Sequence, residues 1–93
     1  MNDQRIIVAD LSWSTSAQDI RELFETAGRV SGVRLVTTDS GESIGVAIIT
    51  MNKSDADRAV ALFDGTVIND KKIAVRAEQP DEQVVNRMFL SVA

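Results

Sequence analysis

The sequence predicts one α+β domain whose elements follow the order strand, helix, strand, strand, helix, strand. Two segments carry apolar residues at the spacing of an amphipathic helix, and four short segments are rich in β-branched residues, as strands are. The length of 93 residues leaves room for a single hydrophobic core. We therefore expect a four-stranded antiparallel sheet with two helices packed on one of its faces.

The first strand and the first helix are expected at the start of the chain. Residues 5–10 form a β-branched run of strand length. Ser16 is a predicted N-cap, because Asp19 lies three positions later, as in a capping box, and apolar residues then recur at helical spacing. Gly28 is suited to ending this helix, which is predicted over residues 17–27.

The middle of the chain predicts two strands and the second helix. Residues 30–37 alternate in polarity, which indicates a strand with one face inward. The continuous apolar run over residues 44–51 instead indicates a strand that is partly covered on both faces. Ser54, followed by Asp57, predicts a second capped helix, and Gly65 marks its end.

The last strand completes the predicted sheet. Residues 67–68 can pair briefly across a two-residue turn, and residues 71–78 alternate in polarity as one strand. Pro80 is the only proline and marks the expected boundary, so residues 1–80 form the domain and residues 81–93 a C-terminal extension. Apolar side chains recur at helical spacing in this extension, which predicts a short amphipathic helix.

The composition excludes several classes of function. With no cysteine and no histidine, the chain offers no disulfide, no thiolate zinc site and no imidazole base, so we expect neither an enzyme nor a cofactor or metal site. No apolar run approaches the roughly 20 residues of a membrane-spanning helix, and the fold predicts no cleft for a small-molecule substrate. The net charge of −4 argues against strong nucleic-acid binding, although it is compatible with a local basic patch.

The element order and two strand motifs resemble the RNA-recognition motif, a family with a ferredoxin-like βαββαβ fold, over residues 5–78. The sequence Ile-Ile-Val-Ala-Asp-Leu at residues 6–11 is similar to the family's short ribonucleoprotein motif. The sequence Ile-Gly-Val-Ala-Ile-Ile-Thr-Met at residues 44–51 is similar to its longer one. Asp-Ile-Arg-Glu-Leu-Phe at residues 19–24 is a common family version of the first helix.

Within that family, residues 43–47 and 11–24 look most like the Aly/REF messenger-RNA export adaptors. This resemblance implies a non-enzymatic domain in messenger-RNA processing or export that binds single-stranded RNA weakly, mainly by electrostatic contacts, and docks protein partners. It also implies a location inside the cell, in the nucleus, with cytoplasmic and mitochondrial locations as alternatives. The rival hypothesis is a protein-interaction or dimerisation module of the same fold that has lost RNA binding.

The candidate RNA-binding residues follow from this resemblance. The family stacks bases on aromatic residues of the two motif strands, whereas alternation here places aliphatic side chains at those outward positions. Arg34 and Arg76 fall on outward strand positions with Lys72 near them, where they either contact phosphates or only solvate the sheet. Trp13 is either a lid on the core or an exposed anchor for a base or a partner. The full candidate set is Arg5, Ile7, Trp13, Arg34, Val46, Ile48, Lys72 and Arg76.

A second candidate surface would bind proteins. Glu22, Glu25 and Asp64 lie in or beside the two predicted helices and would make the helical face negative, which suits an arginine-rich segment. Met88 and Phe89 belong to the apolar stripe of the C-terminal extension. They are expected to pack on an aliphatic patch of the sheet formed by Ile7, Val46 and Ile48, in the same chain or in a second copy. The alternative is that the extension is a disordered tail.

Overall fold

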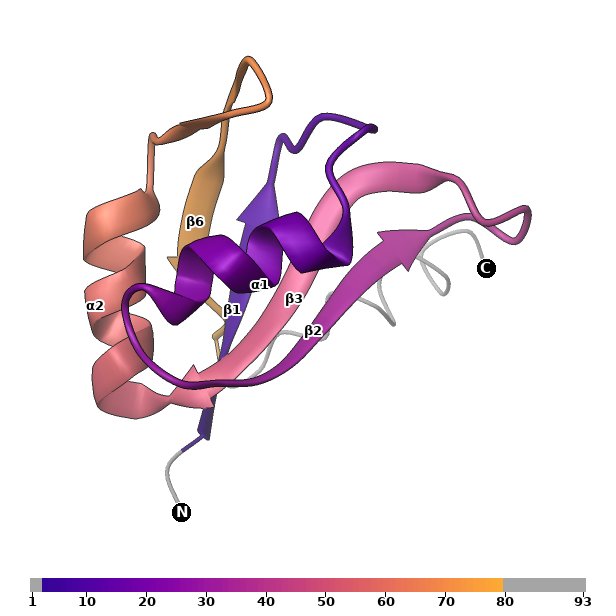
Figure 1. Ribbon diagram of the computed structural model, residues 1–93. Coiled ribbons are helices and arrows are strands. Elements are labelled where there is room, and N and C mark those ends of the chain that lie inside the picture. The colour runs from indigo at the N-terminus through magenta and orange to yellow at the C-terminus, as the bar shows by residue number, and fades with distance from the viewer. Residues whose placement is uncertain (1–2, 80–93) are drawn as a thin grey trace.

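The computed structural model describes residues 3–79, and it has the predicted order of helices and main-sheet strands, with a two-stranded ribbon before the last strand (Figure 1). Four strands form one antiparallel sheet in the order β2-β3-β1-β6, and a separate two-stranded ribbon joins β4 to β5. The elements are β1 (Asp3–Ala9), α1 (Ala17–Glu25), β2 (Val30–Thr37), β3 (Ser43–Asn52), α2 (Lys53–Phe63), β4 (Val67–Ile68), β5 (Lys71–Lys72) and β6 (Ala74–Ala77). The predicted α+β fold is therefore confirmed.

The predicted C-terminal helix, with Met88 and Phe89, lies outside the described residues. Within residues 3–79, neither helix is long and apolar enough to cross a membrane.

The hydrophobic core lies between one face of the sheet and the two helices. Ile6 of β1 and Ile49 of β3 are fully buried there, opposite each other in the strand register. Phe24 of α1 and Phe63 of α2 meet edge to face, with ring centroids 5.0 Å apart. Such aromatic pairs add attraction beyond the area they bury, so this contact fixes the two helices to each other as well as to the sheet.

The first helix begins as predicted and ends earlier than predicted. Ser16 Oγ accepts a hydrogen bond from the Asp19 amide, and an Asp19 carboxylate oxygen accepts one from the Ser16 amide, both at 3.1 Å. The helix ends at Glu25 with Thr26 as its C-cap, so the prediction that Gly28 terminates it is wrong. Gly28 instead allows close packing, because a Cβ there would overlap the side chain of Asp55 on α2.

The second helix has a different cap from the predicted one. Asn52, the last residue of β3, is the N-cap, and its Oδ1 accepts a hydrogen bond of 2.9 Å from the Asp55 amide. Ser54 already lies inside the helix, because α2 follows β3 without a loop. The predicted end is confirmed: Gly65 follows the C-cap Asp64 and has a φ of +85°, a conformation that glycine adopts without strain.

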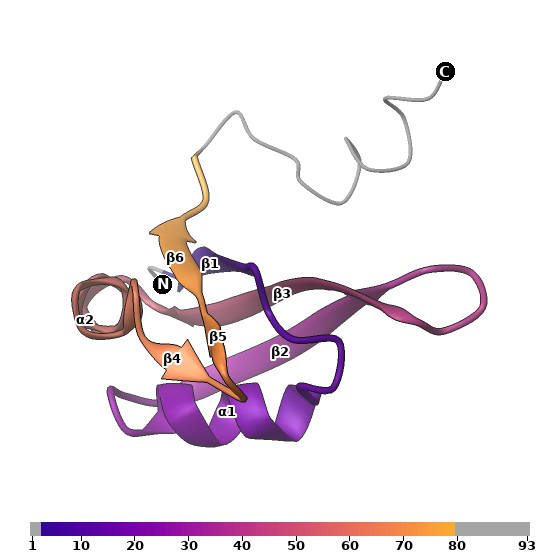
Figure 2. The same ribbon diagram turned by 90° about the horizontal axis from the view of Figure 1, so that it is seen from above.

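The predicted last strand is divided in two. Lys71 and Lys72 pair with β4 across a turn at Asn69 and Asp70, whose φ angles of 50° and 65° are left-handed. The chain joins the main sheet only from Ala74, in the register of β1. Figure 2 shows the ribbon of β4 and β5 reaching away from the sheet toward α1. Lys72 is therefore not part of the four-stranded sheet.

Candidate nucleic-acid interface

Four predicted site residues lie side by side across the face of the sheet that is opposite the helices. Arg34 of β2 pairs with Ile48 of β3, Ile48 pairs with Ile7 of β1, and Ile7 pairs with Arg76 of β6. We call these four residues the outer row. Strand alternation places their side chains away from the core residues Ile6 and Ile49. The outer row thus has one arginine at each end and two isoleucines at its centre.

The aliphatic centre of the outer row is buried. Ile7 is 4% exposed and Ile48 is 6% exposed, although neither belongs to the core under the helices. They form a cross-strand pair at the middle of the sheet, where opposed side chains are close enough to contact. Val46, the third member of the predicted patch, is partly exposed.

The same burial confirms one prediction about β3. The continuous apolar run indicated a strand covered on both faces, and Ile48 is buried on one face while Ala47 and Ile49 are buried on the other. The arginines at the two ends of the outer row are both exposed.

Arg5 and Arg34 border a shallow hollow on this face. The hollow has a volume of about 320 Å³, and Gly32, Ile48 and Thr50 also line it. Arg5 makes an ion pair of 3.2 Å with Glu78, so its charge is partly compensated. Arg34 makes no ion pair with any residue in the described part of the chain. Of these two arginines, Arg34 has the charge that is open to an anionic ligand.

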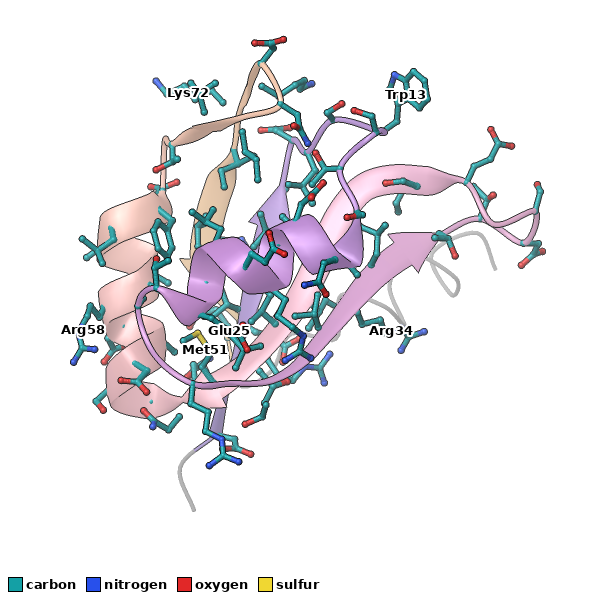
Figure 3. All side chains as sticks on the ribbon, in the orientation of Figure 1. Trp13, Glu25, Arg34, Met51, Arg58 and Lys72 are labelled. Atoms are coloured by element: carbon teal, nitrogen blue, oxygen red, sulfur yellow. The ribbon has the colours of Figure 1, made fainter. Side chains whose placement is uncertain are left out.

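Lys72 does not join this group of cations. The sequence predicted it beside the two outer arginines, but the chain leaves the sheet between β5 and β6, at the buried Ile73. The Lys72 side chain lies instead close to Gly65: a Cβ added to Gly65 would be 3.6 Å from Cε of Lys72. Figure 3 shows Lys72 far from Arg34, so the two cannot contact one phosphate.

Trp13 lies apart from the outer row. It is 83% exposed, which excludes the predicted alternative of a lid on the core. Figure 3 shows its ring projecting from the loop between β1 and α1, at the opposite end of the sheet from Met51. Ile44 and Lys71, which the sequence did not link to Trp13, line the same hollow as this ring. Sequence spacing gives no signal for that juxtaposition, since three separate segments create it.

The acidic residues predicted for protein binding have local partners. Glu22 accepts a hydrogen bond of 3.0 Å from Gln18, and Glu25 lies 3.6 Å from Arg21, one turn earlier on α1. Asp64 accepts a 2.9 Å hydrogen bond from the Val75 amide and thereby joins the end of α2 to β6. This structural hydrogen bond is a sufficient role for Asp64, whereas both glutamates lie on the exposed surface of α1.

The carboxylates do not gather into a metal site. Within residues 3–79, no group of three or more acidic side chains could hold a metal ion. The pKa of Asp19 is lowered below 3.8, chiefly by the hydrogen bond from the Ser16 amide, which identifies it as a helix cap. The described carboxylates thus act in capping and local pairing, and the groups left for binding a ligand are the exposed cations, the apolar side chains and the indole of Trp13.

Comparisons with known proteins agree with this fold. The family model described as RNA recognition motif matches residues 6–74. A single-stranded TG1-3 DNA-binding protein of Schizosaccharomyces pombe is 33% identical over 88% of this chain and 25% of its own length. The SR-type shuttling mRNA binding protein HRB1 of Saccharomyces cerevisiae is 32% identical over 81% of this chain and 16% of its own length. This chain thus spans a quarter or less of these two curated relatives.

Solved structures share the same fold. The RNA recognition domains 1 and 2 of Sex-lethal from Drosophila melanogaster match with a TM-score of 0.78 at 22% identity, over 84% of this chain and 51% of that one. The RNA-binding protein PG1 matches with a TM-score of 0.79 at 23% identity, over 86% of this chain and 99% of that one. At this identity the likeness supports the architecture alone.

Proposed function

This chain belongs to the RNA recognition motif family, and on that basis we propose that it is a non-enzymatic domain that binds single-stranded RNA weakly, mainly by electrostatic contacts. The observation that carries the proposal is the outer row, which has exposed arginines at both ends and buried isoleucines between them. An arginine contacts phosphate through several N–H donors and needs no particular base.

The proposed weakness of binding has two physical causes. Phe24 and Phe63 are buried under the helices, and no aromatic residue stands in the outer row, so the sheet lacks stacking platforms worth about 1–3 kcal/mol per base. The net charge of −4 also opposes the approach of a polyanion. Two phosphate contacts, from Arg34 and Arg76, would give a slope of log affinity against log salt of about −1.4.

We place this domain in messenger-RNA processing or export, in the nucleus. The names of the relatives support this, because one is a shuttling mRNA binding protein and another, from Homo sapiens, is a U4/U6 recycling protein that is 28% identical over 91% of this chain and 9% of its own length. The resemblance to the Aly/REF adaptors suggests a protein-docking role as well. The exposed Glu22 and Glu25 on α1 support it, since they suit an arginine-rich segment.

Titration with a fluorescent single-stranded RNA at low and moderate salt tests the proposal. The intact 93-residue chain should bind at low salt, and Arg34→Glu with Arg76→Glu should abolish binding. The matched control is Arg29→Glu with Lys53→Glu, which changes the net charge equally at exposed positions outside the outer row. Melting temperatures should show that both double variants are folded.

Two outcomes would count against the proposal. Equal binding by the outer-row variant and the control variant would remove the sheet face from the site. No binding by the unmodified chain at low salt and high protein concentration would favour the rival, a protein-interaction module without RNA binding.

A further inference from the structure

Trp13 is held in an exposed position by a loop that is fixed at both ends. Before it, Leu11 is buried and its amide donates a 3.0 Å hydrogen bond to the Gly45 carbonyl on β3. After it, Thr15 is 1% exposed and its amide donates a 3.0 Å hydrogen bond to the Ser12 carbonyl, which closes a turn around the indole. These bonds fix the backbone that carries the indole before any ligand binds, so little backbone entropy is lost on binding.

Two further contacts fix the loop against the rest of the fold. The Thr15 hydroxyl accepts a 2.8 Å hydrogen bond from the side-chain amide of Asn69, in the turn of the β4–β5 ribbon. Gly45 has a φ of +82°, and a Cβ there would lie 2.9 Å from the Leu11 carbonyl oxygen. The close approach of the Trp13 loop to β3 therefore depends on glycine at position 45.

A hollow of about 320 Å³ opens beside the indole. Trp13 and Ile44 are its exposed apolar residues, at 83% and 44% exposure, and Ser12 and Ser43 also line it. Lys71 lines it from the ribbon and makes no ion pair with any residue among residues 3–79. The volume is at the lower end of the range for small-ligand pockets.

We propose that this hollow binds one nucleotide of a single strand, with its base stacked on Trp13 and its phosphate paired with Lys71. The inference rests on the proposed function. It adds a base-stacking residue outside the sheet, whose own surface has none. An exposed aromatic face, hydroxyl groups and an uncompensated cation together match a base and a phosphate. A basic peptide fits less well, because the Lys71 ammonium would repel it.

The hollow and the outer row are close enough to bind the same RNA molecule. Ile44 lines the hollow and Ile48 stands in the outer row, and both belong to β3. Four residues of β-strand span at most about 13 Å, which a few nucleotides can bridge. An oligonucleotide of eight residues is therefore long enough to test both sites at once.

Tryptophan fluorescence tests the inference directly, because Trp13 is the only tryptophan in the chain. Octauridylate should quench the emission of the intact protein, since stacking places the base on the indole. Polyphosphate, which carries no bases, should not. Trp13→Leu should bind octauridylate roughly 5- to 100-fold more weakly in an anisotropy titration, whereas Trp13→Phe should bind nearly as well as the parent.

Matched variants separate the hollow from other exposed groups. Lys71→Ala should weaken octauridylate binding and reduce the salt slope by about 0.7, the value for one phosphate contact. Leu62→Ala removes an apolar side chain that is 57% exposed on α2, and it should leave both affinity and quenching unchanged.

The outcomes distinguish this inference from the proposed function. The nucleotide site would be overturned if RNA left the emission of the parent protein unchanged and Trp13→Leu bound RNA with full affinity. If that binding still depended on Arg34, the proposed function would stand. Absence of any RNA binding would overturn both. Equal quenching by polyphosphate would exclude stacking, and quenching by an arginine-rich peptide without quenching by RNA would assign the hollow to a protein partner.

Discussion

Single glycines decide how closely segments of this domain approach one another. Gly45 combines a left-handed backbone with a carbonyl oxygen in the space that a side chain would need. Gly32, on the neighbouring strand β2, needs no unusual φ, and a Cβ added to it would have no neighbouring atom within 4 Å. The two residues have the same chemistry, yet only Gly45 is required by the backbone around it.

We expect Gly45→Ala to lower the free energy of unfolding by about 1–3 kcal/mol, because both the positive φ and the contact with Leu11 are unfavourable for alanine. Gly32→Ala is the control and should change stability by less than about 0.5 kcal/mol. Urea unfolding followed by circular dichroism of the backbone measures both, since Trp13 is already exposed in the folded protein. A stable Gly45→Ala variant would show that the Trp13 loop is not fixed by this contact.

The helices of this domain are defined at their first turns by side-chain caps. α1 uses Ser16 and Asp19 reciprocally, whereas α2 uses Asn52, which also ends β3. A strand that runs directly into a helix leaves the first helical amides without partners in the sheet, and the Asn52 side chain supplies one. The cap of α2 is therefore also the corner between two elements.

A prediction about the cap of α2 compares Asn52, the cap in the structure, with Ser54, the cap that the sequence pattern indicated. Asn52→Ala should lower the free energy of unfolding by about 1 kcal/mol, because the Asp55 amide loses its acceptor. Ser54→Ala, at the position that the sequence pattern indicated, should cost less than about 0.5 kcal/mol. Chemical denaturation of the two variants compares them, and a larger loss in Ser54→Ala would contradict the assigned cap.

The cap of α1 gives a prediction about pH. The pKa of Asp19 is lowered in the folded state, so its charged form stabilises the fold above the usual pKa of 3.8, and this contribution is lost as the pH falls through the lowered value. Asp19→Asn should melt below the parent at neutral pH, and the difference should disappear in acid. A difference in melting temperature that stays constant down to about pH 2 would exclude the carboxylate charge as its cause.

Among residues 3–79, the two outer-row arginines and two exposed glutamates stand on opposite sides of the sheet. Arg34 and Arg76 stand on the face opposite the helices, and Glu22 and Glu25 stand on α1, where Arg21 pairs with Glu25. At low salt the Debye length is comparable to the thickness of the domain, so we expect the acidic side to weaken the proposed RNA binding on the other side.

Neutralising that acidic side should therefore strengthen RNA binding. Glu22→Gln with Glu25→Gln removes two negative charges from a net charge of −4, and we expect a gain in affinity of a few-fold at low salt that disappears at high salt. The same variant should bind an arginine-rich peptide more weakly than the parent. Anisotropy titrations at two salt concentrations measure both effects, and a gain that persists at high salt would contradict a long-range cause.

The local pattern of the sequence was enough to predict the order of the elements and the face of the sheet on which each strand residue lies. Strand alternation and helical spacing depend on local geometry, so the order of residues along each strand is enough to assign Ile7, Arg34, Ile48 and Arg76 to one face. The capping box at Ser16 was equally local, because both of its hydrogen bonds join residues three positions apart.

Which of these residues reach solvent, and which lie next to one another, depends on the tertiary structure. The division of the last strand at Ile73 separated Lys72 from the sheet, and Ile7 and Ile48 are buried although alternation places them on the outer face. The hollow that joins Trp13, Ile44 and Lys71 arises where three segments distant in sequence converge. Exposure and convergence depend on contacts between remote segments, and those contacts exist only once the chain has folded.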